Sequence, residues 1–286
     1  MAAEPLVWVA LSDAGGAHAE AAEAAEAEIE RTGAGQGDAL IRPWRELSGP
    51  PPRLIIAVGG QALSGMLASG PRVPLLAVLV PEWAFQRSVA GFNDRSNSAV
   101  LLDQPPARQF AALRLALPDR RRVGVVFGPE SRWQEPAYQR AATDAGLTLV
   151  VGRVSAPDDL ARTLQRTLDD CDVLLAVADS VVFNNASVQN ILTAAYRQRV
   201  PLVGFSPSYV KAGALLAVYS SPTQVGRQAG EMARVFLSGR PLQSPQAPHD
   251  FVVGINAEVA RSLGVPLRPG DEAALVQQLR AAERKP

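Results

Sequence analysis

Arg72-Val73-Pro74-Leu75 occurs a second time in this chain, as Arg199-Val200-Pro201-Leu202, and each copy lies in the same local pattern. An apolar run precedes each copy, at residues 54–58 and 173–177, and leads through a small polar turn into a helical stretch. A second apolar run follows each copy and ends at a proline. Continuous apolar runs of this length are typical of strands buried on both faces of a parallel sheet. The repeat therefore predicts two strand–helix–strand units, either in two similar lobes or within one doubly wound sheet.

Strand patterns alternate with helical patterns along the rest of the chain. This alternation predicts an α/β fold with two Rossmann-like lobes, each with a parallel sheet. Segments containing proline interrupt the patterns at residues 102–105, 220–222 and 247–250, and we expect these to form a multi-strand hinge. The predicted N-terminal lobe comprises residues 1–102 plus 223–246, and the predicted C-terminal lobe comprises residues 103–222 plus 247–286.

The composition excludes several classes of function. Of the 286 residues 47% are hydrophobic, which is enough for one large or two medium cores. Lys and Arg together number 28, as do Asp and Glu, so the formal net charge is zero. A nucleic-acid or anionic-membrane surface would require a basic excess, so we expect neither partner. Because Cys171 is the only cysteine, no intramolecular disulfide is possible.

The sequence offers little for catalysis. His18 and His249 have no Cys or carboxylate partner at metal-ligand spacing, which argues against a zinc site. The chain has neither a Gly-x-Ser-x-Gly elbow nor a P-loop. Gly59-Gly60 lacks the third glycine and the acidic partner of a dinucleotide fingerprint. We therefore expect a protein without enzymatic activity, cofactor or metal.

A series of short motifs follows in a fixed order after about residue 97. The motifs are Leu117-Pro118-Asp119, residues 121–127, Pro129-Glu130-Ser131, residues 142–147, residues 178–183, residues 199–204, residues 210–215, residues 226–233 and Ile255-Asn256. In this order the motifs resemble the ABC transporter substrate-binding protein family of the type I periplasmic-binding-protein fold. That family includes binders of aromatic amino acids and related small molecules.

The resemblance implies an exported, two-lobed solute-binding protein. Such a protein captures a small molecule, here an amino acid or similar small carboxylate, between its lobes, and closes by hinge motion. An ABC permease is the implied membrane partner, and we expect a monomer. Residues 1–4 look like a start codon placed before a mature chain, so we expect a periplasmic protein whose signal peptide was removed. A lipid anchor before Ala2 remains open.

The N-terminal lobe departs from the family pattern. Members usually have a Thr-Asp-Pro-like turn after the fourth strand, where this chain has Val80-Pro81-Glu82-Trp83. The first turn, residues 12–16, also differs. These departures motivate a rival hypothesis of the same fold, a periplasmic sensor or interaction module that signals to a membrane or receptor partner. A third hypothesis is a cytoplasmic α/β enzyme that acts on sugar phosphates or nucleotides.

Candidate ligand-binding residues follow from the fold class. Ligands of open α/β sheets bind at the carboxyl ends of the strands, where helix N-termini offer free N–H groups. Hydroxyl groups and helix-start amides would hold a carboxylate, an acidic side chain would pair with an ammonium group, and aromatic rings would enclose an apolar body. The candidates are Ser12, Asp13, Gly59, Gly60, Gln61, Glu82 and Trp83 in the first lobe, and Glu130, Ser131, Asp179, Phe183, Ser206 and Ser208 in the second.

Most of these candidates also have a structural interpretation. Asp13, Ser131 and Asp179 are of the residue types that cap helices. Gly59 and Gly60 suit a turn that needs unusual backbone geometry. Trp83 and Phe183 are equally typical of core residues.

Overall fold

The computed structural model describes residues 6–31, 39–92 and 96–284. The chain divides into two compact units, one of residues Met1–Asp103 and Ser220–Asp250 and the other of Gln104–Tyr219 and Phe251–Pro286. The chain therefore passes between the units three times.

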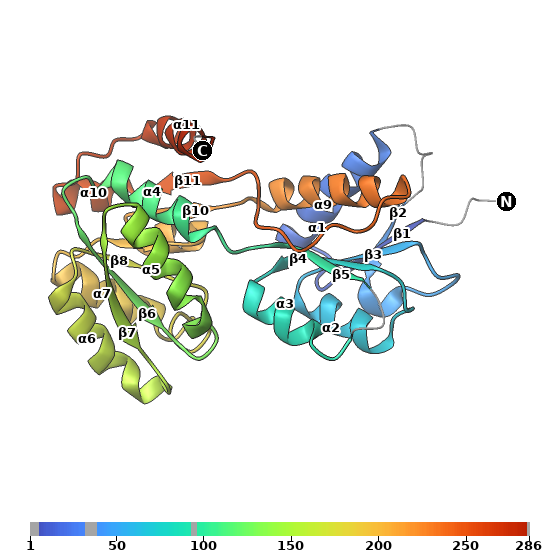
Figure 1. Cartoon of the computed structure of the whole chain (residues 1–286), viewed down its shortest axis with the longest axis horizontal. Coiled ribbons are helices and arrows are strands. Elements are labelled where there is room, and N and C mark those ends of the chain that lie inside the picture. Colours follow the sequence, from blue (N-terminus) through green and yellow to red (C-terminus); the bar gives the residue numbers. More distant parts are fainter. Residues whose placement is uncertain (1–5, 32–38, 93–95, 285–286) are drawn as a thin grey trace. The chain divides into compact units, whose positions relative to one another are not determined.

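The first unit contains a five-stranded parallel sheet of order β2-β1-β3-β4-β5 (Figure 1). Side chains of β1 alternate between the two faces, as expected for a strand covered on both sides. Val7 and Val9 pack with helices α1 and α9, whereas Trp8 and Ala10 pack with α2 and α3. The strands are β1 Val7–Leu11, β2 Ala39–Pro43, β3 Leu54–Val58, β4 Leu75–Val80 and β5 Asn97–Leu101, and the helices are α1 Gly16–Glu30, α2 Gly60–Ser69, α3 Glu82–Val89 and α9 Pro222–Leu237, with a 3₁₀ turn at Trp44–Glu46.

The second unit contains a six-stranded sheet of order β11-β10-β9-β8-β6-β7. Its first five strands in sequence are parallel, as predicted for an α/β lobe, and the last strand, β11, runs antiparallel to β10, so the sheet is mostly parallel. β11 begins at Val252, one residue after the chain re-enters this unit at Phe251, and it pairs with the edge of β10 that β9 leaves open. The strands are β6 Arg122–Phe127, β7 Thr148–Arg153, β8 Val173–Leu175, β9 Leu202–Gly204, β10 Leu216–Tyr219 and β11 Val252–Ile255.

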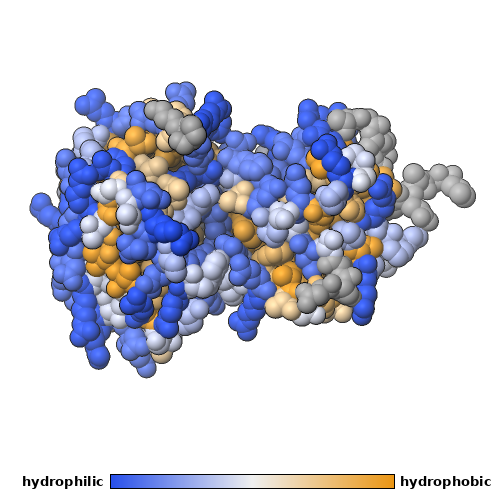
Figure 2. All heavy atoms as spheres, viewed as in Figure 1, coloured by the Kyte–Doolittle hydropathy of each residue, from blue (hydrophilic) through white to orange (hydrophobic). Residues whose placement is uncertain are grey.

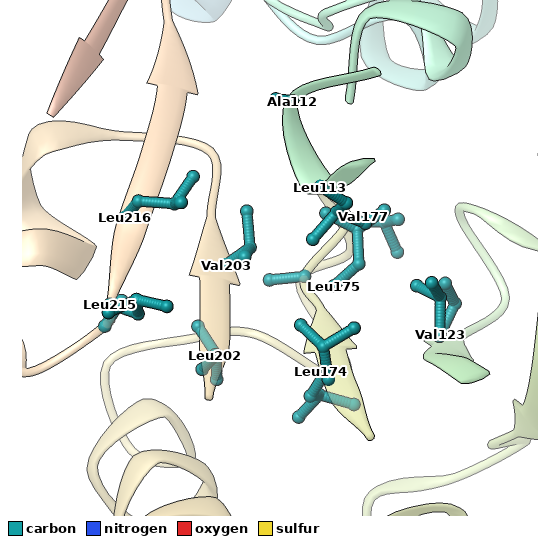
Figure 3. Close-up of a cluster of buried hydrophobic side chains, with 14 of the residues drawn as sticks. Ala112, Leu113, Val123, Leu174, Leu175, Val177, Leu202, Val203, Leu215 and Leu216 are labelled. Carbon is teal, nitrogen blue, oxygen red and sulfur yellow. The ribbon is translucent and has the colours of Figure 1, made fainter. Parts of the chain in front are cut away.

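Helices and one continuous apolar core complete the second unit. Figure 3 shows side chains of β8, β9 and β10 within this core, with Leu113 of α4 among them. The C-terminal helix α11 belongs to the same core, since its Leu275 and Leu279 are buried. The helices are α4 Pro106–Ala116, α5 Glu135–Asp144, α6 Leu160–Asp170, α7 Val188–Arg197, α8 Pro207–Ala212, α10 Ala257–Leu263 and α11 Asp271–Glu283.

The two repeat units differ after their first strands. In the first unit, helix α2 begins two residues after β3 ends. In the second unit, turns occupy residues 180–187 and the helix begins only at Val188. The turns follow from the hydrogen bonds of Asp179, which hold the chain in a tight loop directly after β8.

Among the described residues, none of the helices combines the length and hydrophobicity needed to cross a bilayer. On the face drawn in Figure 2, hydrophilic residues predominate and apolar patches interrupt them.

Candidate ligand-binding site

The predicted site residues lie in the loops and helix starts that follow parallel strands, at the carboxyl edge of their own sheet. In the first unit these positions come after β1, β3 and β4, and in the second unit after β6, β8 and β9. Parallel strands end at a common edge, so the loops of each set are neighbours. The hydrogen bonds within each set show which side chains are already occupied.

Asp179 is the centre of the second set. Its side chain is buried, and its Oδ2 accepts hydrogen bonds from the Ser131 N–H at 2.9 Å and the Ser131 hydroxyl at 2.8 Å. Oδ2 also accepts from the Glu130 N–H at 3.0 Å. Oδ1 accepts from the N–H groups of Val181 and Val182 at 3.0 and 3.3 Å. Five donors satisfy the whole carboxylate, since its two oxygens offer about four lone-pair sites.

Glu130 makes the reciprocal connection. Its carboxylate accepts the Ser180 N–H at 2.7 Å and the Ser180 hydroxyl at 2.8 Å. The loops after β6 and β8 are thus joined in both directions by a carboxylate. Gly128 is required here, because a Cβ at that position would overlap the Asp179 carboxylate. The structure therefore gives Asp179, Glu130 and Ser131 a structural role at this edge.

Three aromatic side chains pack together near the ends of β8 and β9. Phe183 is 7% exposed and lies 6.4 Å from Phe205 and 6.2 Å from Tyr209, measured between ring centroids. Phe205 is half-buried and lies 4.6 Å from Tyr209. Burial raises the pKa of the Tyr209 phenol well above its ordinary value, so that group is neutral at physiological pH. Phe183 is a core residue of this cluster, whereas Phe205 is only half-buried.

Ser206 and Ser208 begin helix α8, directly after Phe205. Ser206 is half-buried and Ser208 is exposed. Ser206 is the N-cap residue of α8, but its side chain makes no capping hydrogen bond. The structure does not connect either serine to the Asp179 network through a hydrogen bond among the described residues.

In the first unit, Ser12 joins the loop after β1 to the start of α2. Its hydroxyl accepts the Ala62 N–H at 2.8 Å, so a residue fifty positions away supplies the cap of this helix. Gly59 has a φ of 89°, and a Cβ there would lie 2.6 Å from the Ser12 hydroxyl oxygen. Gly60 and Gln61, the first two residues of α2, are exposed. Asp13 is also exposed, and its Oδ1 accepts the Gly15 N–H at 3.0 Å.

Glu82 and Trp83 lie in the first turn of helix α3, where the sequence analysis expected a loop. A residue before a helix often has an extended backbone, and Pro81 takes this N-cap position. Just before it, Leu79 has a φ of 55° at an irregularity between β4 and β5. Irregularities of this kind re-aim the following residues. Both Glu82 and Trp83 are half-buried.

Asp103 holds the start of α3, a contact that the sequence analysis did not find. Its Oδ2 accepts the Glu82 N–H at 2.6 Å, and the Glu82 Oε1 accepts the Gln86 amide at 3.1 Å. Burial, and to a smaller extent the nearby Asp103 carboxylate, raise the pKa of Glu82 above its ordinary value.

The raised pKa of Glu82 predicts a pH-dependent stability. Between the ordinary and the raised pKa, the folded state binds more protons than the unfolded state, so stability falls as pH rises through this window. Above this window, the Glu82 carboxylate is charged, and its partial burial destabilises the folded state by the full amount. Glu82→Gln removes this cost because glutamine carries no charge. We expect Glu82→Gln to unfold at a higher temperature than the wild type near neutral pH, and this advantage to disappear toward about pH 4.

The measurement is the thermal midpoint of both proteins from about pH 4 to about pH 8. Glu20→Gln, at an exposed position of α1, is the control and should follow the wild type across the range. A Glu82→Gln protein that is less stable than the wild type near neutral pH would mean that the Glu82 carboxylate is stabilising.

Four residues at these edges were not predicted from the sequence: Trp133, Ser180, Phe205 and Asp103. Trp133 is 46% exposed, and its indole N–H donates to the Glu130 carbonyl at 3.0 Å. Ser180 and Phe205 immediately follow Asp179 and β9, so their positions after a strand were a usable signal. Asp103 gave no such signal, because its role depends on where the chain leaves the first unit.

The chain is similar to proteins of a known family. A family model described as ABC transporter substrate binding protein matches residues 19–276. A search of proteins of curated function gives no match.

Three solved structures share the fold. A substrate-binding protein with adhesive properties from Clostridium difficile, in a ligand-free, open form, has a TM-score of 0.70 at 15% identity, over 93% of this chain and 96% of that one. A conserved domain protein from Vibrio cholerae has a TM-score of 0.62 at 17% identity, over 95% and 96%. An ABC domain from Streptococcus pneumoniae, in complex with L-Trp, has a TM-score of 0.61 at 17% identity, over 92% and 95%.

Proposed function

We propose that this chain, which belongs to the ABC transporter substrate-binding protein family, captures a small carboxylate such as an amino acid for ABC-type import. Proteins of this family bind small-molecule ligands and work with ABC permeases. The proposed contacts are the loops at the carboxyl edges of the two sheets. The proposed location is the periplasm, where such binding proteins collect their ligands.

The start of helix α2 is the observation that carries this proposal. The N–H of Ala62 is taken by the Ser12 hydroxyl and that of Leu63 by the Gly59 carbonyl. The N–H groups of Gly60 and Gln61 donate no hydrogen bond to any described residue, and both residues are exposed. Two adjacent free N–H groups at the positive end of a helix dipole are a favourable site for a carboxylate.

Of the acidic candidates, Glu82 is the best placed to pair with an ammonium group of the ligand. Asp179 and Glu130 are engaged by donors of their own loops. Glu82 is half-buried, and it begins α3, which packs against α2. A ligand ammonium group beside Glu82 would favour its charged form. An α-amino acid therefore suits this edge better than a simple carboxylate does, and the Streptococcus pneumoniae structure with L-Trp is consistent with that class.

Gly60→Pro tests the carboxylate contact directly. Proline is favoured at the first position of a helix, and Gly59, with a φ of 89° and a ψ of 164°, lies outside the α region that a following proline disfavours. A Cβ at Gly60 would meet nothing within 4 Å. The substitution therefore removes one free N–H without disturbing the fold. We expect it to weaken binding of a small carboxylate by about tenfold or more, since a charge-assisted hydrogen bond is lost.

Gly60→Ala is the matched control, because it adds a Cβ in the same open space and keeps the N–H. Ligands would first be found by thermal shift with amino acids, simple carboxylates, nucleosides and sugars, and affinities then measured by calorimetry. The proposal fails if no carboxylate raises the midpoint. The assignment to α2 fails if Gly60→Pro and Gly60→Ala bind the ligand equally well.

A further inference from the structure

The first unit contains a cavity of about 410 Å³ away from the loops described above. Trp8 is the second residue of β1, and residues 69–71 connect the end of α2 to β4. Trp44 and Arg45 directly follow the carboxyl end of β2, whereas residues 69–71 lie at the end of α2 and the start of its connection to β4, so the cavity lies beside the second half of α2. Ser12, Gly60 and the other candidate site residues are not among its lining residues. Its lining comprises Trp8, Trp44, Arg45, Leu47, Ser48, Gly49, Met66, Ser69, Gly70 and Pro71.

Trp44 is held in a fixed position in the wall of this cavity. It lies in the 3₁₀ turn after β2, and its ring packs on Gly65 of α2. A Cβ at Gly65 would lie 2.7 Å from the Trp44 Cδ2 atom and closer still to two other ring carbons. The absence of a side chain at Gly65 thus creates the room for the indole. Trp8 and Met66 add a second indole and a thioether, groups that pack well on flat aromatic molecules.

The polar groups of the cavity are donors and a cation. The Trp44 indole Nε1 is buried and has no hydrogen-bond partner among the described residues. A buried donor without an acceptor is costly, and such a group in a native protein calls for an explanation. The Arg45 guanidinium lies 4.5 Å from the centre of the Trp44 ring. None of the lining residues is acidic, so the wall carries a net positive charge.

We propose that this cavity is a second ligand site, for a planar aromatic carboxylate. The aromatic body would lie against Trp8, Trp44 and Met66, and the carboxylate would pair with Arg45. The volume lies within the range of small-molecule sites, about 300–1,000 Å³. This site is separate from the carboxyl-edge site, and its test does not depend on the proposed import function.

Naphthalene-2-carboxylate is the probe, with uncharged naphthalene-2-carboxamide as its partner, and calorimetry on the full chain is the measurement. We expect the carboxylate to bind more tightly than the amide. Arg45→Gln should weaken carboxylate binding by about fivefold and leave amide binding unchanged, because only the charge pair is lost. Arg42→Gln is the matched control, since Arg42 is a nearby exposed arginine that does not line the cavity.

Two further variants separate this cavity from other sites. Ser69→Phe places a ring in the cavity mouth at an exposed helix end, and it should abolish binding of both probes with a near wild-type thermal midpoint. Gly60→Pro, at the start of α2 and outside the lining of the cavity, should leave both affinities unchanged. The proposal is overturned if Arg45→Gln and Arg42→Gln bind the carboxylate equally, or if Gly60→Pro weakens the probe as much as Arg45→Gln does.

Discussion

Replacing Asp179 by alanine is expected to lower the free energy of unfolding by about 3–5 kcal/mol. Asp179 is 2% exposed, and its carboxylate accepts five hydrogen bonds, from Glu130, Ser131, Val181 and Val182. Alanine would leave four backbone N–H groups and a hydroxyl without their acceptor at a buried position. A loss of this size corresponds to a decrease of roughly 10 °C in the thermal midpoint.

Urea unfolding of the wild type, Asp179→Ala and Asp169→Ala measures this effect. Asp169 is the control, because it is an exposed aspartate of α6 whose Oδ1 accepts one hydrogen bond from Gln165. Its replacement should change the free energy of unfolding by less than about 0.5 kcal/mol. If Asp179→Ala remains as stable as the wild type but loses ligand binding, then Asp179 contacts the ligand and its structural assignment here is wrong.

The sequence was informative about Asp179 only up to a point. Its place after an apolar run correctly predicts that it lies at the carboxyl edge of a sheet. Its residue type is equally typical of a cap and of an ammonium partner. Only the positions of Glu130 and Ser131, almost fifty residues earlier, decide between these roles, because they supply three of the five donors. Periodicity cannot show that two distant loops meet in this way.

The contrast between local sequence patterns and contacts of distant segments also applies to the rest of the fold. The strands of both units and most helices follow from local apolar runs, and the α/β architecture follows from their alternation. The antiparallel β11 could not be predicted, because its direction depends on where the chain re-enters the second unit. Helix α3 was missed because Pro81 was interpreted as part of a loop, although proline is also found at helix starts.

The edge loops of the candidate site could be predicted from the sequence, whereas the cavity beside Trp44 could not. Gly60 and Gln61 were predicted as helix-start amides, and their N–H groups are free in the structure because Ser12 caps the next residue. The Trp44 cavity had no signature in the sequence. It forms where a 3₁₀ turn, the end of α2 and the beginning of β1 meet, and these segments are distant in the chain. Edge loops can therefore be predicted from strand patterns, whereas cavities between distant segments cannot.

The packing of α1 against α9 predicts a second large effect, at Gly226. A Cβ at Gly226 would overlap the main-chain carbonyl oxygen of Ala21, and one at Gly230 would lie 2.6 Å from the carbonyl oxygen of Ala25. The two helix backbones thus meet directly, through small residues on both sides. Glu28 of α1 also pairs with Arg234 of α9 at 3.1 Å, which fixes the register of the contact.

Gly226→Ala is therefore expected to lower the free energy of unfolding by about 2–4 kcal/mol, although alanine favours a helix by about 1 kcal/mol over glycine. The helices would have to separate, and in doing so they would loosen the buried face that Val225 and Ala229 share with β1. Urea unfolding measures the loss. Gly60→Ala is the control in the same unit, and it should be neutral or stabilising because its Cβ meets nothing.

The identity of the contacted atom sharpens this prediction. The new Cβ would meet the backbone of Ala21 and not its side chain, so Ala21→Gly should fail to rescue Gly226→Ala. A double variant that regains wild-type stability would show that the Ala21 methyl group was the obstacle. An unchanged free energy of unfolding in Gly226→Ala alone would show that α1 and α9 can move apart at little cost. Failure of the rescue, together with a stable Gly60→Ala protein, would establish that glycine at this position sets the distance between the two helix backbones.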